Sequence, residues 1–182
     1  MNRSAIINVV PQPESLGVKE MPERLEDTLA AIAAHAIDLR ALIALVTAGS
    51  TEQEKLERVD ELIDLLTNCH RVPMVIGAAT ILGNSGIYSF QFVYEYPAYA
   101  MSIMGALLNN TMLSESYAVR RACSSALRDV YDMSCPLFGD AAQIIPLIEE
   151  AFSTVDPSAD REIYEDLEYI CEDYRIWSMT PA

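Results

Sequence analysis

Basic residues are scarce in this chain of 182 residues. Lysine and arginine together number 12, against 27 aspartates and glutamates, and the formal net charge is −15. Phosphate binding depends on clusters of lysine and arginine that release counterions from the nucleic acid. The same acidic excess repels anionic lipid surfaces. The composition therefore argues against nucleic acid as a ligand and favours a basic protein as the partner.

Long apolar runs are also missing. A membrane-spanning helix needs about 20 largely apolar residues, whereas the most apolar part of the chain is interrupted by Gly83-Asn84-Ser85-Gly86 and again by Glu95 and Pro97. Asn8 and Pro11 interrupt the apolar residues near the N-terminus before they reach the length of a secretory signal. We therefore expect a cytoplasmic protein and do not expect a membrane protein.

No catalytic motif, nucleotide fingerprint or metal-ligand set is present. His35 and His70 have no metal-binding spacing, and Cys69 beside His70 supplies at most two ligands, fewer than the four of a structural zinc site. The four cysteines lie far apart without a Cys-x-x-Cys pair, so we interpret them as reduced thiols. Cys123 follows two arginines that could lower its pKa, although a cysteine on an alanine-rich helix face is more commonly just packed. We expect no metal and no cofactor.

What the sequence does contain is a marked segregation of charge. The stretch between Arg71 and Glu115 has a single charged side chain, Glu95. By contrast, residues 136–182 hold eleven acids and two bases, which contribute −9 to the net charge. This distribution predicts a core or binding cleft in the middle of the chain, and an acidic surface at its end.

The first half of the chain shows helical periodicity. One stripe recurs at spacings of four and three residues between Pro22 and Gly49: Leu25, Leu29, Ile32, Ala36, Leu39, Ile43 and Val46. Ser50 and Thr51 stand three residues before Gln53 and Glu54, which is the spacing of a capping box. The helix that this box opens has its own stripe of Leu56, Val59, Ile63 and Leu66. The short connection predicts an antiparallel helical hairpin.

Further helices are predicted from Val72 to Leu82, with Gly83–Gly86 as a breaker, from Pro97 to Leu108, and from Ser116 to Met133. Residues 87–96 fit either a helix or a strand. Ala118, Ala122, Ala126, Val130 and Met133 form a seam of mostly small residues along which a neighbouring helix can approach. Asp140 is a candidate cap for the next helix, in which Pro146 either kinks the helix or marks its start.

The last predicted helix, from Pro157 to Trp177, carries the strongest recognition signal. Its apolar stripe consists of Ile163, Leu167, Ile170, Tyr174 and Trp177. Its other side is acidic and aromatic, and we take these residues as candidates for binding a basic partner: Glu162, Glu165, Asp166, Glu168, Tyr169, Glu172 and Asp173. The alternative is an ordinary solvated amphipathic helix docked on its own core.

A second candidate site surrounds the isolated Glu95. Burial among aromatic residues would raise the pKa of this carboxyl and could make it an acid or base. The candidate pocket consists of Tyr88, Phe92, Glu95 and Tyr99. The alternatives are that Glu95 faces solvent, or that it pairs with Arg120 or Arg121.

These patterns predict an all-α, single-domain bundle of six or seven helices over residues 22–182, preceded by an extended arm over residues 1–21. The expected function is non-enzymatic: an acidic, inhibitor-like (immunity-like) protein that binds a basic protein through its last helix. The alternative is a helical-bundle enzyme or small-molecule binder built around Glu95. The sequence leaves homo-oligomerisation open.

Overall fold

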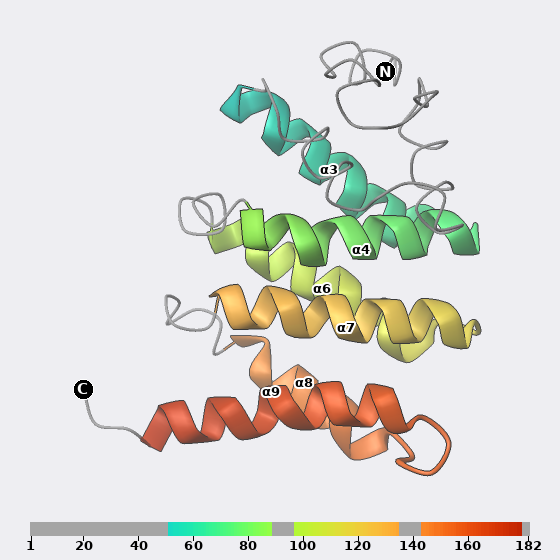
Figure 1. Ribbon diagram of the computed structural model, residues 1–182, viewed down its shortest axis with the longest axis vertical. Helices are drawn as coiled ribbons and strands as arrows, with labels where there is room; N and C mark the ends of the chain where they lie inside the picture. Colours follow the sequence, from blue (N-terminus) through green and yellow to red (C-terminus); the bar gives the residue numbers. More distant parts are fainter. Residues whose placement is uncertain (1–50, 89–96, 135–142, 180–182) are drawn as a thin grey trace, which may run out of the picture. The chain divides into compact units, whose positions relative to one another are not determined.

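The computed structural model describes residues 51–88, 97–134 and 143–179. Over these ranges the chain forms helices and no strand, which confirms the predicted all-α fold (Figure 1). The helices are α3 (Glu52–Asn68), α4 (Val72–Tyr88), α6 (Pro97–Leu113), α7 (Tyr117–Ser134), α8 (Ile145–Thr154) and α9 (Arg161–Met179). The predicted arm over residues 1–21 and the predicted helix between Pro22 and Gly49 lie outside the described residues.

The predicted capping box opens α3. The backbone N–H of Thr51 donates to Glu54 Oε2 at 2.7 Å, and the backbone N–H of Glu54 donates to Thr51 Oγ1 at 3.3 Å. Two N–H groups that the first helical turn leaves without a helical partner are thereby satisfied. The helix ends at Asn68, and the N–H of the C-cap residue Cys69 still donates to Leu65 O at 3.1 Å.

The buried side of α3 differs from the predicted stripe. Of the four predicted residues only Leu66 is buried, while Leu56, Val59 and Ile63 are half-buried. The buried side instead runs through Arg58, Leu62, Leu65 and Leu66. The prediction missed this rotation because an arginine is read as a surface residue, although burial here lowers the pKa of Arg58 and nearby Glu54 and Glu61 favour its charged form.

Helix α4 continues through the predicted breaker, so the expectation that Gly83–Gly86 ends it is wrong. A Cβ added to Gly83 would lie 3.0 Å from Ala126 Cα and 3.1 Å from Ala126 Cβ, on α7. Glycine in a helix interior costs about 1 kcal/mol relative to alanine, and the close approach of the two backbones compensates for it here. Gly83 is therefore a packing residue, and Ala126 belongs to the seam predicted on α7.

Helices α6 and α7 form an antiparallel hairpin with a connection of three residues, 114–116. Helix α6 is longer than predicted by five residues, and α7 begins and ends one residue later than predicted. The expectation that the neutral segment is largely core is confirmed for α6, where Ile103, Met104 and Leu107 are buried. On α7, Ala126, Val130 and Met133 of the predicted seam are buried, whereas Ala118 is exposed and Ala122 half-buried.

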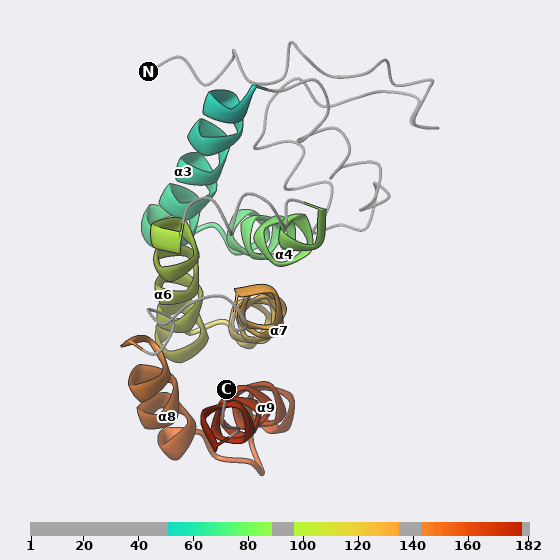
Figure 2. The ribbon, with the colours of Figure 1, turned by 90° about the vertical axis from the view of Figure 1, so that its left-hand side faces the viewer.

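Helices α8 and α9 form a second hairpin, and α9 packs against α7. Figure 2 shows α7 and α9 stacked on one side and α6 and α8 on the other. Pro146 is in the first turn of α8, which confirms that it marks a helix start; Asp140 lies outside the described residues. Helix α9 begins at Arg161, four residues after the predicted start at Pro157, because residues 157–160 form a turn on Asp156.

The chain divides into two compact units, and the boundary falls inside α4 between Ile81 and Leu82. The second unit holds the end of α4 together with α6, α7, α8 and α9. Among the described residues, no helix combines the length and apolar character needed to cross a membrane.

Candidate functional site

Helix α9 carries all seven residues predicted to bind a partner, and its core side fixes how they are presented. Ile163, Leu167 and Ile170 are completely buried, as the predicted apolar stripe requires, and Cys171 adds to them. Three other sides of the helix remain: one faces α7, one faces α8 and one faces outward. The seven residues are divided among these sides.

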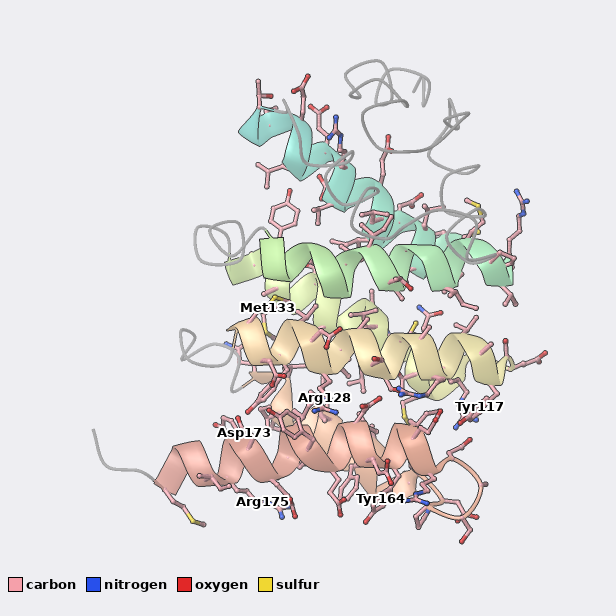
Figure 3. The ribbon with its side chains drawn as sticks, in the orientation of Figure 1. Tyr117, Arg128, Met133, Tyr164, Asp173 and Arg175 are labelled. Carbon is pink, nitrogen blue, oxygen red and sulfur yellow. The ribbon has the colours of Figure 1, made fainter. Side chains whose placement is uncertain are left out.

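The side facing α7 holds Glu162, Asp166 and Asp173. Arg121 Nε donates to Glu162 Oε2 at 2.7 Å, and Tyr131 Oη donates to Asp173 Oδ2 at 3.1 Å. In Figure 3, Arg128 and Asp173 lie along the edge where α7 and α9 meet, and Tyr164 and Arg175 lie on the opposite edge of α9. These three carboxylates therefore serve the packing of the chain itself.

The polar side chains that join α7 and α9 form a polar seam: Arg121, Ser124, Arg128 and Tyr131 on α7, and Glu162, Asp166, Tyr169 and Asp173 on α9. Asp166 is the most buried carboxylate of this polar seam, with 4% of its surface exposed. Arg121 Nη1 donates to its Oδ2 at 2.6 Å, and Ser124 Oγ lies 2.8 Å from the same oxygen. Arg128 Nη1 is 3.6 Å from Oδ1. A buried carboxylate is tolerated only when charges and hydrogen bonds surround it, and α7 supplies both.

Tyr169 also belongs to the polar seam. The Arg128 guanidinium lies over its ring, 4.2 Å from the ring centre, which is cation–π geometry. Desolvation and a hydrogen bond to Asp132 raise the pKa of Tyr169. The phenol therefore remains protonated and links the two helices.

The side of α9 that faces α8 carries a separate set of contacts. The Phe152 and Tyr164 rings lie 4.7 Å apart between centroids, and Arg175 Nη2 is 3.6 Å from Glu149 Oε1. Burial and the nearby carboxylate of Glu168, which accepts a hydrogen bond from the phenol, raise the pKa of Tyr164. This side combines an aromatic contact with an exposed ion pair.

The outward face of α9, defined by Glu165, Glu168 and Glu172, continues at its end into Ile176 and Met179. The spacings of three, four, four and three residues keep the five on one side of the helix. Glu165 and Glu172 are exposed and Glu168 is half-buried, whereas Ile176 and Met179 are 67% and 80% exposed. Arg161 Nε, one turn before Glu165, donates to Glu165 Oε1 at 2.7 Å. The face is thus acidic at first and apolar at its end.

The arginines of the second unit are fully engaged by its own carboxylates. Residues 82–182 contain five arginines, no lysine and fifteen acids. Each arginine lies within 4 Å of a carboxylate: Arg120 contacts Asp160, Arg121 contacts Glu162 and Asp166, Arg128 contacts Asp166, Arg161 contacts Glu165, and Arg175 contacts Glu149. The remaining carboxylates leave an uncompensated negative charge.

A sequence signal for the polar seam exists in the spacing of polar residues on the two helices. Arg121, Ser124, Arg128 and Tyr131 recur on α7 at spacings of three and four residues. Glu162, Asp166, Tyr169 and Asp173 recur on α9 at spacings of four and three. Two polar stripes of opposite charge at helical spacing indicate that the two helices face each other.

The second candidate site is only partly described. Phe92 and Glu95 lie outside the described residues. Tyr88 is the last residue of α4, and Tyr99 is half-buried on α6. Arg120 and Arg121, the proposed partners of Glu95, contact Asp160, Glu162 and Asp166.

Two of the described cysteines, Cys123 and Cys171, are buried. Burial raises the pKa of Cys123 to about 12, and burial together with Glu149 raises that of Cys171 to about 11. Thiolates are the reactive form, so both side chains are inert packing groups. His70 is exposed and His35 lies outside the described residues, within which no group of ligands suited to a metal ion occurs.

No protein-family model, curated protein or solved structure matches this chain.

Proposed function

We propose that the protein is a cytoplasmic, non-enzymatic interaction protein, of the inhibitor type, that binds a basic protein through the outward face of α9. The observation that carries the proposal is the charge balance of the second unit. Its five arginines already contact carboxylates of the same unit, while Glu168 and Glu172 have no arginine within ion-pair distance among the described residues. These two carboxylates are therefore candidates to attract the basic residues of a partner.

The rigid support of the outward face favours the same function. Core residues on one side of α9, the polar seam on another and the α8 contacts on a third hold the helix against rotation. Carboxylates fixed in this way keep their spacing before a partner arrives, which lowers the ordering cost of binding. Their field also accelerates the encounter with a basic protein.

The contacts of α9 reduce the set of seven residues that the sequence predicts to bind a partner. Glu162, Asp166 and Asp173 are engaged with α7, and Tyr169 is held by Arg128. Glu165, Glu168 and Glu172 thus form the acidic part of the proposed binding face. Ile176 and Met179 supply an apolar end, of the kind that anchors many interfaces.

The test compares two triple variants of equal charge. The first replaces Glu165, Glu168 and Glu172 with glutamine. The second replaces three exposed glutamates elsewhere, Glu57, Glu115 and Glu150, with glutamine. Each removes three negative charges and leaves the polar seam intact, so both should fold, as circular dichroism can verify.

The partner is first captured from the native host with the unmodified chain and identified by mass spectrometry. Association rates with that partner are then measured by stopped flow at low and at physiological salt. The α9 triple should associate roughly tenfold more slowly at low salt, with a smaller difference at physiological salt, and the control should stay near the unmodified rate. Equal slowing of both variants, or of neither, would remove the outward face as the binding surface.

A further inference from the structure

Helix α6 presents an uncharged side to solvent. No aspartate, glutamate, lysine or arginine occurs from Pro97 to Leu113. One side of the helix is buried, and the opposite side is exposed or half-buried. This second side is the neutral face of α6, and it consists of Ala98, Met101, Ser102, Gly105, Asn109 and Met112.

Within the described part of the chain, no contact accounts for the glycine at the middle of this face. Gly105 is the central residue of α6, and a Cβ added to it would have nothing within 4 Å. Gly83 on α4 provides the contrast, since its missing Cβ makes room for Ala126. Glycine destabilises a helix interior relative to alanine, so Gly105 carries a cost that no contact of the described residues repays.

The surroundings of Gly105 suit the approach of another helix. Ser102 Oγ donates to Ala98 O at 3.0 Å, so this hydroxyl is already satisfied within α6 and needs no water. Half-buried methionines flank the small residues, and Leu113 at the helix end is 78% exposed. Small residues at a crossing point let two backbones come close, and the flanking apolar side chains then pack around the crossing.

The charge of the chain favours a second copy as the partner on the neutral face of α6. Two copies of a chain with a net charge of −15 repel each other wherever their acidic surfaces meet, and an uncharged helix avoids that repulsion. A basic partner, by contrast, finds no carboxylate on α6. Because Gly105 is the midpoint of the helix, a two-fold axis there pairs each half of α6 with the other half of its copy, as a self-complementary dimer interface requires.

We propose that the neutral face of α6 is a self-association surface, on which α6 of a second copy crosses at Gly105. This dimer leaves the outward face of α9 available, because α6 and α9 lie on opposite sides of the stacked hairpins (Figure 2). It does not depend on the basic partner and can be tested without it.

The test is sedimentation velocity on the full chain over a range of concentrations. Gly105→Leu places a bulky side chain at the crossing, while Ala118→Leu adds a similar side chain at an exposed position on α7. We expect the unmodified chain and the Ala118 variant to dimerise, more tightly as salt screens the remaining repulsion. The Gly105 variant should be monomeric, with an unchanged circular dichroism spectrum.

A charge substitution keeps the proposal falsifiable if Gly105→Leu fails to fold. Ser102→Glu sets two carboxylates near each other across the proposed axis and should weaken dimerisation roughly tenfold or more. An unmodified chain that stays monomeric at all concentrations overturns the proposal. A dimer that survives both Gly105→Leu and Ser102→Glu overturns it as well.

Discussion

Helix α7 meets its two main neighbours through seams of opposite character. The α6–α7 hairpin is mostly apolar inside: Ile103, Met104 and Leu107 on α6, and Leu127 and Val130 on α7, are all buried. One polar contact joins the two helices, from Arg120 Nε to Thr111 O at 3.1 Å. Toward α9 the polar seam aligns arginine, serine and tyrosine of α7 with carboxylates of α9. A single helix of 18 residues therefore carries two recognition surfaces that obey different rules.

The two seams differ in what they contribute: apolar burial contributes stability, and polar contacts determine the position of one helix against the other. Apolar burial is favourable at about 25 cal/mol per Å², but it is not directional, and neighbouring apolar residues can substitute for one another. A buried carboxylate such as Asp166 contributes less net stability, because its desolvation offsets much of its attraction to arginine. The buried Asp166 carboxylate does, however, disfavour every register of α9 on α7 in which Arg121 and Ser124 no longer contact it. We infer that the apolar seam holds the α6–α7 hairpin and that the polar seam fixes the register of α9.

The largest effect is expected from Leu107→Ala in the apolar seam. Leu107 is completely buried, so the lost packing and the cavity should lower the free energy of unfolding by about 2 to 5 kcal/mol. Chemical denaturation measures the change. Leu113→Ala, at an exposed position of the same helix, should have almost no effect. Equal effects of the two substitutions would contradict the assignment of this seam as the core.

The next largest effect is expected from Asp166→Ala in the polar seam. The substitution removes the acceptor of Arg121 Nη1 and leaves the Ser124 hydroxyl with Arg121 O as its remaining acceptor. The loss should cost about 1 to 3 kcal/mol. Glu172→Ala on the outward face is the control and should change little. In a double-mutant cycle with Arg121→Gln, the two substitutions should be non-additive. Simple additivity would show that the pair contributes nothing to the seam.

A third substitution probes the side of α7 that meets α4. Gly83→Ala places a Cβ 3.0 Å from the backbone of Ala126, which cannot shift cheaply, so a loss of about 1 to 3 kcal/mol is expected. Gly105→Ala, where the Cβ meets nothing, should instead stabilise the dilute monomer by about 0.5 to 1 kcal/mol. Thermal unfolding of the two variants should therefore shift in opposite directions. Stabilisation by both substitutions would refute the close approach at Gly83, and destabilisation by both would contradict the open space at Gly105.

The smallest effect concerns the pH dependence of Asp129, whose Oδ2 lies 3.3 Å from a Cβ added to Gly83 of α4. Desolvation and the neighbouring Asp132 raise the pKa of Asp129, and desolvation also raises that of Asp132. A carboxyl whose pKa is higher in the folded chain favours folding while protonated, and this contribution is lost as the pH rises from the ordinary value of 3.8 through the raised one. Asp129→Asn should therefore increase stability at neutral pH, by less than about 1 kcal/mol because the group is partly exposed.

The pH series itself provides the check. Denaturation of Asp129→Asn should show a weaker fall in stability with rising pH above about 4 than the unmodified chain. Glu115→Gln, which removes an exposed charge of the same sign, is the matched control. If the two variants follow the same pH profile, burial does not perturb Asp129.

The sequence predicted local structure well where one physical cause dominates. The Thr51–Glu54 box opens α3, and periodicity placed both ends of α7 within one residue. The failures depend on tertiary contacts. Gly83 is tolerated in α4 because Ala126 lies against it, and the buried side of α3 includes an arginine. Both require knowledge of the neighbouring helix.

In the candidate site, too, local periodicity was predictable from the sequence and tertiary contacts were not. Periodicity predicted that the acidic residues and the apolar stripe occupy different sides of α9, and Ile163, Leu167 and Ile170 are buried as expected. It could not divide the acidic residues further, because whether Glu162 or Glu165 faces α7 depends on which helix stacks on α9. The structure adds that division, and with it a smaller set of candidate residues.

The buried thiols make the two hairpins separately observable. Cys123 lies among the buried residues of α7, and Cys171 lies on α9 near Glu149 of α8. An alkylating reagent reaches each sulfur only when the surrounding helices part, so the rate of modification at each position reports a local opening event. Mass spectrometry of labelled peptides can follow both in one sample. Slower labelling of Cys123 than of Cys171 would identify α6–α7 as the more persistent hairpin, without any substitution in the chain.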